Sequence, residues 1–163
     1  MEKSHWYIGA PNGVVVCINR WEGHRLQGCF YHGCSEEATK FENIDQALFQ
    51  LEQFFNFLNF PYATTTERTF QQKSREAEGK RERIKRMDDK ELLKKHGELG
   101  TFIVRVQHRQ HNSWQGRITW MEHNKTLSFR SIWEMVKLIV SAVKASDTEQ
   151  EEEELSWFDD ETK

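Results

Sequence analysis

The stretch that decides the fold is residues 14–55, VVVCINRWEGHRLQGCFYHGCSEEATKFENIDQALFQLEQFF. Residues 102–143, FIVRVQHRQHNSWQGRITWMEHNKTLSFRSIWEMVKLIVSAV, repeat its pattern without a gap, at an offset of 88 positions from Val14 to Phe102. Identical residues stand at equivalent places in five pairs: Val16/Val104, Gln27/Gln115, Gly28/Gly116, Phe41/Phe129 and Ile44/Ile132. Such self-similarity indicates two copies of one supersecondary unit, so each copy tests the interpretation of the other.

Alternating apolar residues predict a pair of strands at the start of each copy. In the first copy they alternate over 14–18 and 26–30, joined by a hairpin connection of moderate length over 21–24. In the second copy they alternate over 102–106 and 114–120. A short third strand is expected in each copy, near 38–41 and 127–129.

A helix is predicted to close each copy. Asn43 or Asp45 can cap the first helix, and Ser131 with Glu134 forms a capping box for the second. Apolar stripes at helical spacing follow, namely Ile44, Leu48, Leu51, Phe55 and Leu58, and then Ile132, Met135, Val136, Ile139 and Val143. The sequence therefore predicts an α+β protein of two pseudo-equivalent β-β-β-α repeats, with antiparallel sheets and helices packed on one face.

The chain is expected to divide into four segments. Residues 1–62 and 99–146 are the two repeats, 63–98 is a charged, partly helical connector, and 147–163 is a disordered acidic tail. The connector favours helix by composition. Its acidic residues interleave with its basic ones, however, so we favour a solvated or partly disordered connector over a basic helix that touches nucleic acid or an acidic partner.

Composition and charge narrow the classes of protein. Of the 163 residues, 37% are hydrophobic, and no run reaches the roughly 18 apolar residues of a membrane span. The N-terminus lacks the apolar region of a secretory signal, so a cytoplasmic location is expected. The three cysteines lack metal-ligand spacing and are expected to be free thiols, with no metal and no cofactor.

The strand alternation also predicts which side chains face away from the helices. In the second copy, one row of residues is expected to be buried, namely Phe102, Val104, Val106, Trp114, Ile118 and Trp120. The opposite row is polar and comprises Arg105, Gln107, Arg109, Gln115, Arg117 and Thr119. The equivalent row of the first copy is far more apolar, namely Val15, Cys17, Asn19, Trp21, Gln27, Cys29 and Tyr31. The two copies therefore differ where a ligand would sit, and not where the core sits.

Arginine side chains suit phosphates or carboxylates, because the planar guanidinium donates two hydrogen bonds at once. Amide side chains can orient such a group, and a serine hydroxyl in the turn can add one contact. The predicted ligand-binding residues are Arg105, Gln107, Arg109, Ser113, Gln115 and Arg117. The alternative interpretation is a hydrated antiparallel face without a ligand.

Two short elements in this region resemble those of the PilZ family of cyclic-di-GMP receptors. Arg105-x-x-x-Arg109 matches the family's paired arginines, and Ser113 and Gly116 match its Asp/Asn-x-Ser-x-x-Gly element. His111 stands where that family has an acid or an amide. The resemblance covers about a dozen residues and implies a cyclic dinucleotide as ligand.

The acidic tail is a second candidate for interaction. Nine acidic residues and one lysine lie between Asp147 and Lys163, so the net charge of −3 divides into −8 for the tail and +5 for the rest. Leu155, Trp157 and Phe158 interrupt the acidic run, and we expect them to bind a partner. A merely solubilising tail is the alternative.

No catalytic constellation is recognised, so we do not expect an enzyme. The expected function is a cytoplasmic adaptor whose second repeat binds an anionic protein partner or ligand. A receptor for a cyclic dinucleotide is the alternative, and a nucleic-acid-binding protein is the third hypothesis. No membrane association is expected. A homodimer is also envisaged, because Val15, Tyr31 and Phe57 are apolar residues that one chain is expected to leave uncovered.

Overall fold

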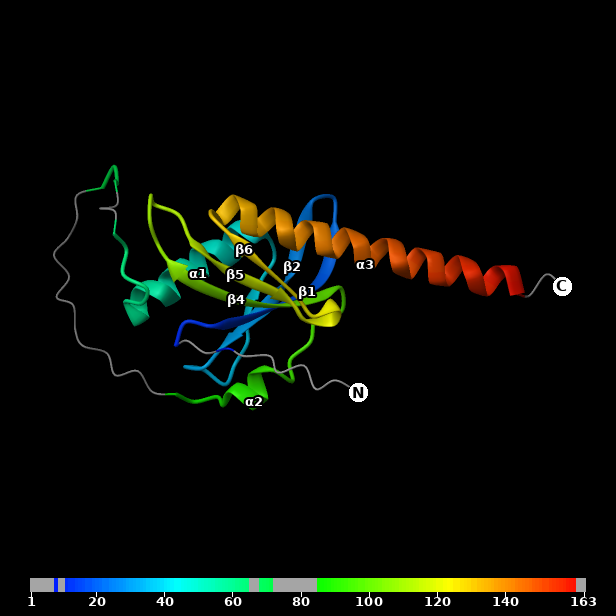
Figure 1. Ribbon diagram of the computed structural model, residues 1–163, viewed down its shortest axis with the longest axis horizontal. Helices are drawn as coiled ribbons and strands as arrows, with labels where there is room; N and C mark the ends of the chain where they lie inside the picture. Colours follow the sequence, from blue (N-terminus) through cyan, green and yellow to red (C-terminus); the bar gives the residue numbers. More distant parts are fainter. Residues whose placement is uncertain (1–7, 9–10, 65–67, 72–84, 161–163) are drawn as a thin grey trace.

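The computed structural model describes residues 8, 11–64, 68–71 and 85–160, and over 149–160 it describes the backbone alone (Figure 1). Within that part of the chain the protein is α+β, with one antiparallel sheet of six strands and three helices. The elements follow in the order β1 (Val14–Glu22), β2 (Arg25–His32), β3 (Thr39–Phe41), α1 (Ile44–Leu58), α2 (Asp89–Leu92), β4 (Gly100–His108), β5 (Gln115–Trp120), the 3-10 helix η1 (Met121–His123), β6 (Lys125–Phe129) and α3 (Ile132–Asp160).

The middle of the sheet is the antiparallel pair β1–β4. The strand order is β3-β2-β1-β4-β5-β6. Outward from the central pair, β1, β2 and β3 therefore follow in chain order on one side, and β4, β5 and β6 follow in chain order on the other. Val15 lies directly opposite Ile103, and these are two residues that the sequence offset aligns with each other. The first and second halves of the chain therefore each build one side of a single sheet.

Both halves carry the same irregularity in their first hairpin. The pairing of β1 with β2 shifts between Ile18 and Arg20, and the pairing of β4 with β5 shifts between Val106 and His108. A β-bulge places two residues opposite one. Side chains beyond it consequently point to the other face than strict alternation would predict.

Two glycines lie beside these bulges for a steric reason. Gly28 is opposite Ile18 and Gly116 is opposite Val106. A Cβ atom on Gly28 would overlap the backbone oxygen of Cys17, and one on Gly116 would overlap the backbone oxygen of Arg105. Only a residue without a side chain allows the neighbouring strand to approach this closely.

The two long helices also begin in the same way. Asn43 Oδ1 accepts a hydrogen bond from the backbone N of Gln46 (2.8 Å), and the Gln46 side chain accepts one from Glu42 N (2.8 Å). At α3, Ser131 Oγ accepts from Glu134 N (3.1 Å), and the Glu134 side chain accepts from the residue before the cap (3.2 Å). Of the two caps considered for the first helix, Asn43 is the observed one.

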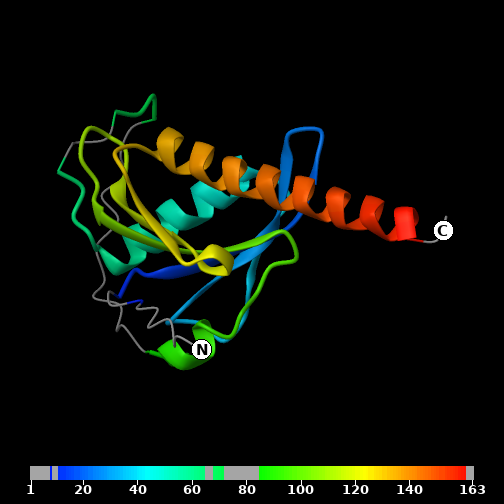
Figure 2. The same ribbon diagram turned by 45° about the vertical axis from the view of Figure 1, so that its right-hand side comes forward.

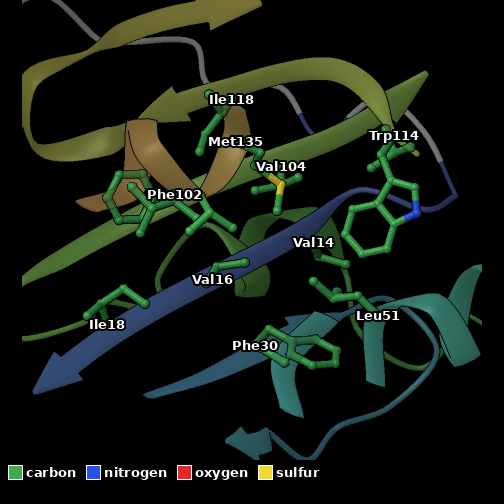
Figure 3. Packing of buried hydrophobic residues seen from close by; sticks show 14 of the residues in the cluster. Val14, Val16, Ile18, Phe30, Leu51, Phe102, Val104, Trp114, Ile118 and Met135 are labelled. Carbon is green, nitrogen blue, oxygen red and sulfur yellow. The ribbon is translucent and has the colours of Figure 1, made fainter. Parts of the chain in front are cut away.

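Helices α1 and α3 cover one face of the sheet, and the main core lies between them and the strands (Figures 2 and 3). The strand residues that alternation predicts to be buried point into this core, as do both helical stripes. Four of the predicted core residues are only partly buried, namely Ile44, Leu48, Trp120 and Ile132. Three residues of α1 and α3 outside the predicted stripes are also buried, namely Ala47, Phe54 and Ala142.

The opposite face of the sheet, called the second face below, has a smaller core that the sequence did not reveal. Met87 and Leu92 pack there against Val15, Cys17 and Ile103, and Ile8 and Met121 complete the cluster. The segment that carries Met87 is held to the sheet, because the backbone N of Arg86 and of Met87 both donate to Gly33 O (2.7 and 3.0 Å).

This second core corrects two expectations. Residues 85–98 of the connector are packed against the sheet rather than solvated throughout, and the helix there, α2, has only four residues. The middle of the connector, 72–84, lies outside the described residues. Val15 is 0% exposed, so it offers no apolar surface for a dimer, whereas Phe57 is 38% exposed. Tyr31 is half-buried beside the second core.

The connection between β1 and β2 is shorter than predicted. Only Gly23 and His24 separate the strands, with φ angles of 53° and 69°. Positive φ at both central residues is the geometry of a type I′ turn, whose twist matches that of the flanking strands.

The acidic C-terminal segment is helical as far as Asp160, whereas the sequence predicts a disordered tail from residue 147. The described buried residues of α3 end at Val143, and the helix continues beyond them past the edge of the sheet (Figures 1 and 2). Extending an existing helix adds one hydrogen bond per residue, while nucleation is the costly step. The packed turns of α3 therefore nucleate the helix. Its continuation is favourable because glutamate has a high helix propensity.

The two bulge glycines provide a matched test of this architecture. Gly28→Ala and Gly116→Ala should each lower the free energy of unfolding by at least about 2 kcal/mol, because each new Cβ meets a backbone carbonyl that cannot move aside. Gly33→Ala is the control, since its Cβ would lie 3.7 Å from its nearest neighbour, Met87 O. Urea denaturation measures all three, and a large effect at only one of the two bulge glycines would contradict the proposed steric equivalence.

Candidate anion-binding face

The polar part of the second face lies over β4, β5 and β6. Arg105 of β4 is directly opposite Arg117 of β5, and Arg117 is in turn opposite Ser128 of β6. The three side chains therefore form a row across three strands on the face that α1 and α3 leave open. Arg105 is half-buried, and Arg117 and Ser128 are exposed. Arg105 and Arg117 are called the arginine pair below.

The arginine pair forms no ion pair with the described residues of the protein. Like charges directly opposite each other on antiparallel strands are destabilising. Among the residues that the structure describes, no carboxylate lies within 4.0 Å of either guanidinium, and the observed ion pairs involve other cations, namely Arg20, Lys85, Arg109 and Arg130. An anion placed between the two guanidinium groups would offset their repulsion.

The Arg105 side chain also has an unused donor. Its Nε is buried and finds no hydrogen-bond partner within the described part of the chain. A buried donor without a partner costs roughly 1–3 kcal/mol, and a charged one more. A hydrogen bond from Nε to an anionic oxygen would recover this free energy. Arg105 should therefore contribute more to anion binding than Arg117.

Hydroxyl groups extend the row toward the edge of the sheet. Thr119 of β5 and Thr126 of β6 share a hydrogen bond of 2.8 Å between their Oγ1 atoms. Ser128 stands one step further along β6, opposite Arg117. The sequence pattern does not distinguish Thr126 or Ser128 as site residues, although the alternation of β6 places both on the second face. The one feature of the sequence that points to these two residues is that β6 is a short strand of mostly polar residues.

Arg109 does not belong to this face, which corrects the prediction that it shares a row with Arg105 and Arg117. Its side chain is 4% exposed and lies under α1. Nε donates to Pro61 O (2.7 Å), and Nη1 donates to Asn56 Oδ1 (2.7 Å) and to Glu52 Oε1 (3.4 Å). The reason is the bulge in β4. Gln107 is the extra residue between the paired positions, so the face of the following residues is reversed.

The remaining predicted residues have structural contacts of their own. Ser113 Oγ accepts a hydrogen bond from Ile132 N at the start of α3 (2.9 Å). The Gln115 amide both accepts from Gln110 N and donates to Gln110 O (2.9 Å each), which ties the turn together. Gln107 is exposed. The geometry therefore brings together Arg105 and Arg117, and it separates them from Arg109 and Ser113.

The elements that resemble the PilZ family do not converge in space. Arg105 and Arg109 point to opposite faces of the sheet, and Ser113 caps a helix on the side away from Arg105. The three tail residues predicted to bind a partner, Leu155, Trp157 and Phe158, belong to the extension of α3, and their side chains lie outside the described residues.

Two other kinds of site are absent from the described residues. No helix there is long and apolar enough to cross a membrane. No group of three or more histidine, cysteine, aspartate or glutamate side chains is placed there to hold a metal ion. The cationic row over β4 and β5 is one chemically distinctive feature of the second face, and the two cysteines that pair across β1 and β2 are another.

Comparison of the chain with protein-family models, with curated proteins and with solved structures finds no match in any of the three. The arrangement of the second face itself is thus the basis for a functional proposal.

The contacts of Arg109 lead to a prediction about stability. Arg109→Ala should lower the free energy of unfolding by about 2–4 kcal/mol, because it leaves the Pro61 carbonyl and the Asn56 side chain without their buried donor. Arg117→Ala should change it by less than about 0.5 kcal/mol, since that side chain is exposed. Chemical denaturation of both variants measures the difference, and equal effects would show that Arg109 is not a structural residue.

Proposed function

We propose that this protein is a non-enzymatic binding module that recognises an anionic partner through the open second face of β4, β5 and β6. The observation that carries the proposal is the arginine pair, two guanidinium groups held opposite each other with no protein carboxylate nearby among the described residues. A guanidinium donates to carboxylate or phosphate oxygens in a fixed fork. Two forks at cross-strand distance suit one branched anion or two neighbouring ones.

An acidic segment of another protein is the favoured partner. A sheet surface with exposed Arg117 and Ser128 can accept an extended chain lying across it. A cyclic dinucleotide is the alternative, but the residues that would favour it by resemblance, Arg109 and Ser113, bind elsewhere in the protein. Nucleic acid is the third hypothesis, and the net charge of −3 argues against it, because electrostatic attraction dominates such binding.

We further propose that the two halves are copies of one β-β-β-α unit, with 1–62 and 99–146 as the repeats. The pairing of Val15 with Ile103, the matching bulges and the matching helix caps support this proposal. In it, the first copy serves packing and the second presents the recognition surface. A cytoplasmic location is proposed as well, because the three cysteines are free thiols, as is usual in a reducing compartment.

Substitution of the arginine pair tests the binding proposal directly. A fluorescent oligoglutamate peptide should bind the full chain, and Arg117→Ala should weaken that binding by about tenfold or more, since a charge-assisted hydrogen bond is lost. Arg105→Ala should have at least the same effect. Arg20→Ala is the matched control, because Arg20 is an exposed strand arginine that already pairs with Glu22 (3.1 Å).

The same titration, repeated with cyclic di-GMP and with single-stranded DNA, separates the three hypotheses. Binding of the dinucleotide alone, lost in Arg105→Ala, would replace the favoured partner by the alternative. Binding of DNA that weakens steeply with salt would support the third hypothesis. Equal affinities for the wild type, Arg117→Ala and Arg20→Ala would remove the arginine pair from the function.

The extension of α3 is proposed as a second interaction element. Deleting residues 151–163 should leave the melting temperature within about 2 °C of the full chain, because the described buried residues of α3 end at Val143. In-cell crosslinking should give a partner adduct with the full chain that disappears both on deletion and in Trp157→Ala. An adduct that survives both changes would show that the extension only confers solubility.

A further inference from the structure

Two cysteines face each other across the first hairpin on the second face. Cys17 of β1 is directly opposite Cys29 of β2. Cys29 is opposite Lys40 of β3, and Cys17 is opposite Thr101 of β4. Lysine, two thiols and threonine thus form one row across four strands. Cys17 and Cys29 are called the thiol pair below.

The two thiols differ in their surroundings. Cys17 is 1% exposed and belongs to the second core, where Met87 and Leu92 cover it. Cys29 lies at the margin of that core and is partly open to solvent. An oxidant can therefore reach Cys29 from solution, and Cys17 is held behind it.

Donors and positive charges surround Cys29. The Cys17 thiol and the Tyr31 hydroxyl act on its sulfur as hydrogen-bond donors, and the charges of Lys40 and Lys95 act on it through space. Lys95 also lies over the Tyr31 ring, with Nζ 5.0 Å from the ring centroid. The carboxylate of Glu122, which accepts a hydrogen bond from Thr101 N (3.0 Å), acts through its charge on Cys17.

These neighbours make Cys29 the nucleophile and Cys17 the hydrogen-bond donor. The pKa of Cys29 is lowered to about 6, first because the Cys17 thiol donates a hydrogen bond to its sulfur, then through Tyr31 and the two lysines, against the opposing effect of burial. The same hydrogen bond, together with burial, raises the pKa of Cys17. At neutral pH, Cys29 is consequently a thiolate and Cys17 remains a thiol.

We propose that the thiol pair is a site of oxidation by hydroperoxides, at which Cys29 reacts first and Cys17 resolves the product into a cross-strand disulfide. In the first step the Cys29 thiolate attacks the O–O bond of a hydroperoxide, a sulfur–oxygen bond forms, and the departing alkoxide takes a proton from water. In the second step the Cys17 sulfur attacks the Cys29 sulfenic acid, the sulfur–sulfur bond forms, and hydroxide leaves with the Cys17 proton as water. Two electrons pass from the two sulfurs to the peroxide.

The register of the sheet allows the second step. Residues directly opposite on antiparallel strands have Cβ atoms about 4.5–5.5 Å apart, and a disulfide needs about 3.5–4.5 Å. A local approach of about 1 Å between β1 and β2 closes the bond. Cys34 is not a competing partner, because it packs against the main core on the other side of the sheet.

The site is distinct from the proposed anion-binding face. Cys17 and Cys29 occupy the places in the first half that the arginine pair occupies in the second, since the sequence offset aligns Cys17 with Arg105 and Cys29 with Arg117. Oxidation at the thiol pair requires no ligand on the second half. A negative result for one of these two proposals therefore does not contradict the other.

Mass spectrometry after peroxide treatment tests the inference. The reduced full chain, exposed to hydrogen peroxide at pH 7, should lose two hydrogens and give one disulfide-linked peptide that joins Cys17 to Cys29. Cys34→Ser, the control, should give the same product. Cys29→Ser should not form it, and Cys17→Ser should accumulate a sulfenic acid on Cys29 that dimedone traps. A disulfide through Cys34, or one between two chains, would overturn the proposal.

Alkylation of the wild-type protein provides an independent measurement that needs no substitution. Cys29 should react with iodoacetamide at pH 7 at least about tenfold faster than Cys34, because the thiolate is the nucleophile. The rate at Cys29 should fall as the pH drops through about 6, where the thiolate becomes protonated. A rate at Cys29 equal to or below that at Cys34 would overturn the assignment of Cys29 as the reactive cysteine.

Discussion

The antiparallel pairing of β1 with β4 is the constraint on which the rest of the structure depends. With Val15 fixed opposite Ile103, the two hairpins extend to opposite sides and both long helices lie over the same face. The second face then carries two equivalent cross-strand positions, each beside a bulge and a glycine. One holds Cys17 and Cys29, and the other holds Arg105 and Arg117. The same backbone site thus supports two different chemistries.

The surroundings of these two positions differ because of residues 85–98, the last part of the connector. It is anchored at Gly33 and packs Met87 and Leu92 over the first half of the second face. The thiol pair is partly desolvated by this cover, which suits sulfur, a weak hydrogen-bonding group. Arg117 in the second half is exposed to water, as a charged group requires when none of the described carboxylates pairs with it.

The sequence predicted the strands, the two long helices and the main core, because local alternation and helical spacing carry that information. It failed where the decisive feature was one extra residue or a few isolated apolar residues. The bulge at Gln107 adds one residue to β4 and thereby turns Arg109 inward, which no composition or period reveals. The second core depends on a few isolated apolar residues such as Met87 in a highly charged segment, so periodicity could not find it. Of the predicted site, Arg105 and Arg117 remain together on an open face.

The continuation of α3 has a consequence for electrostatics within the molecule. A flexible chain carrying nine acidic residues could fold back and act as an intramolecular counterion for Arg105 and Arg117. A helix rises about 1.5 Å per residue, so the stretch from Val143 to Asp160 spans about 25 Å. It leaves from the face opposite the arginines and projects outward (Figure 1). Helical stiffness therefore holds the described part of this extension away from Arg105 and Arg117.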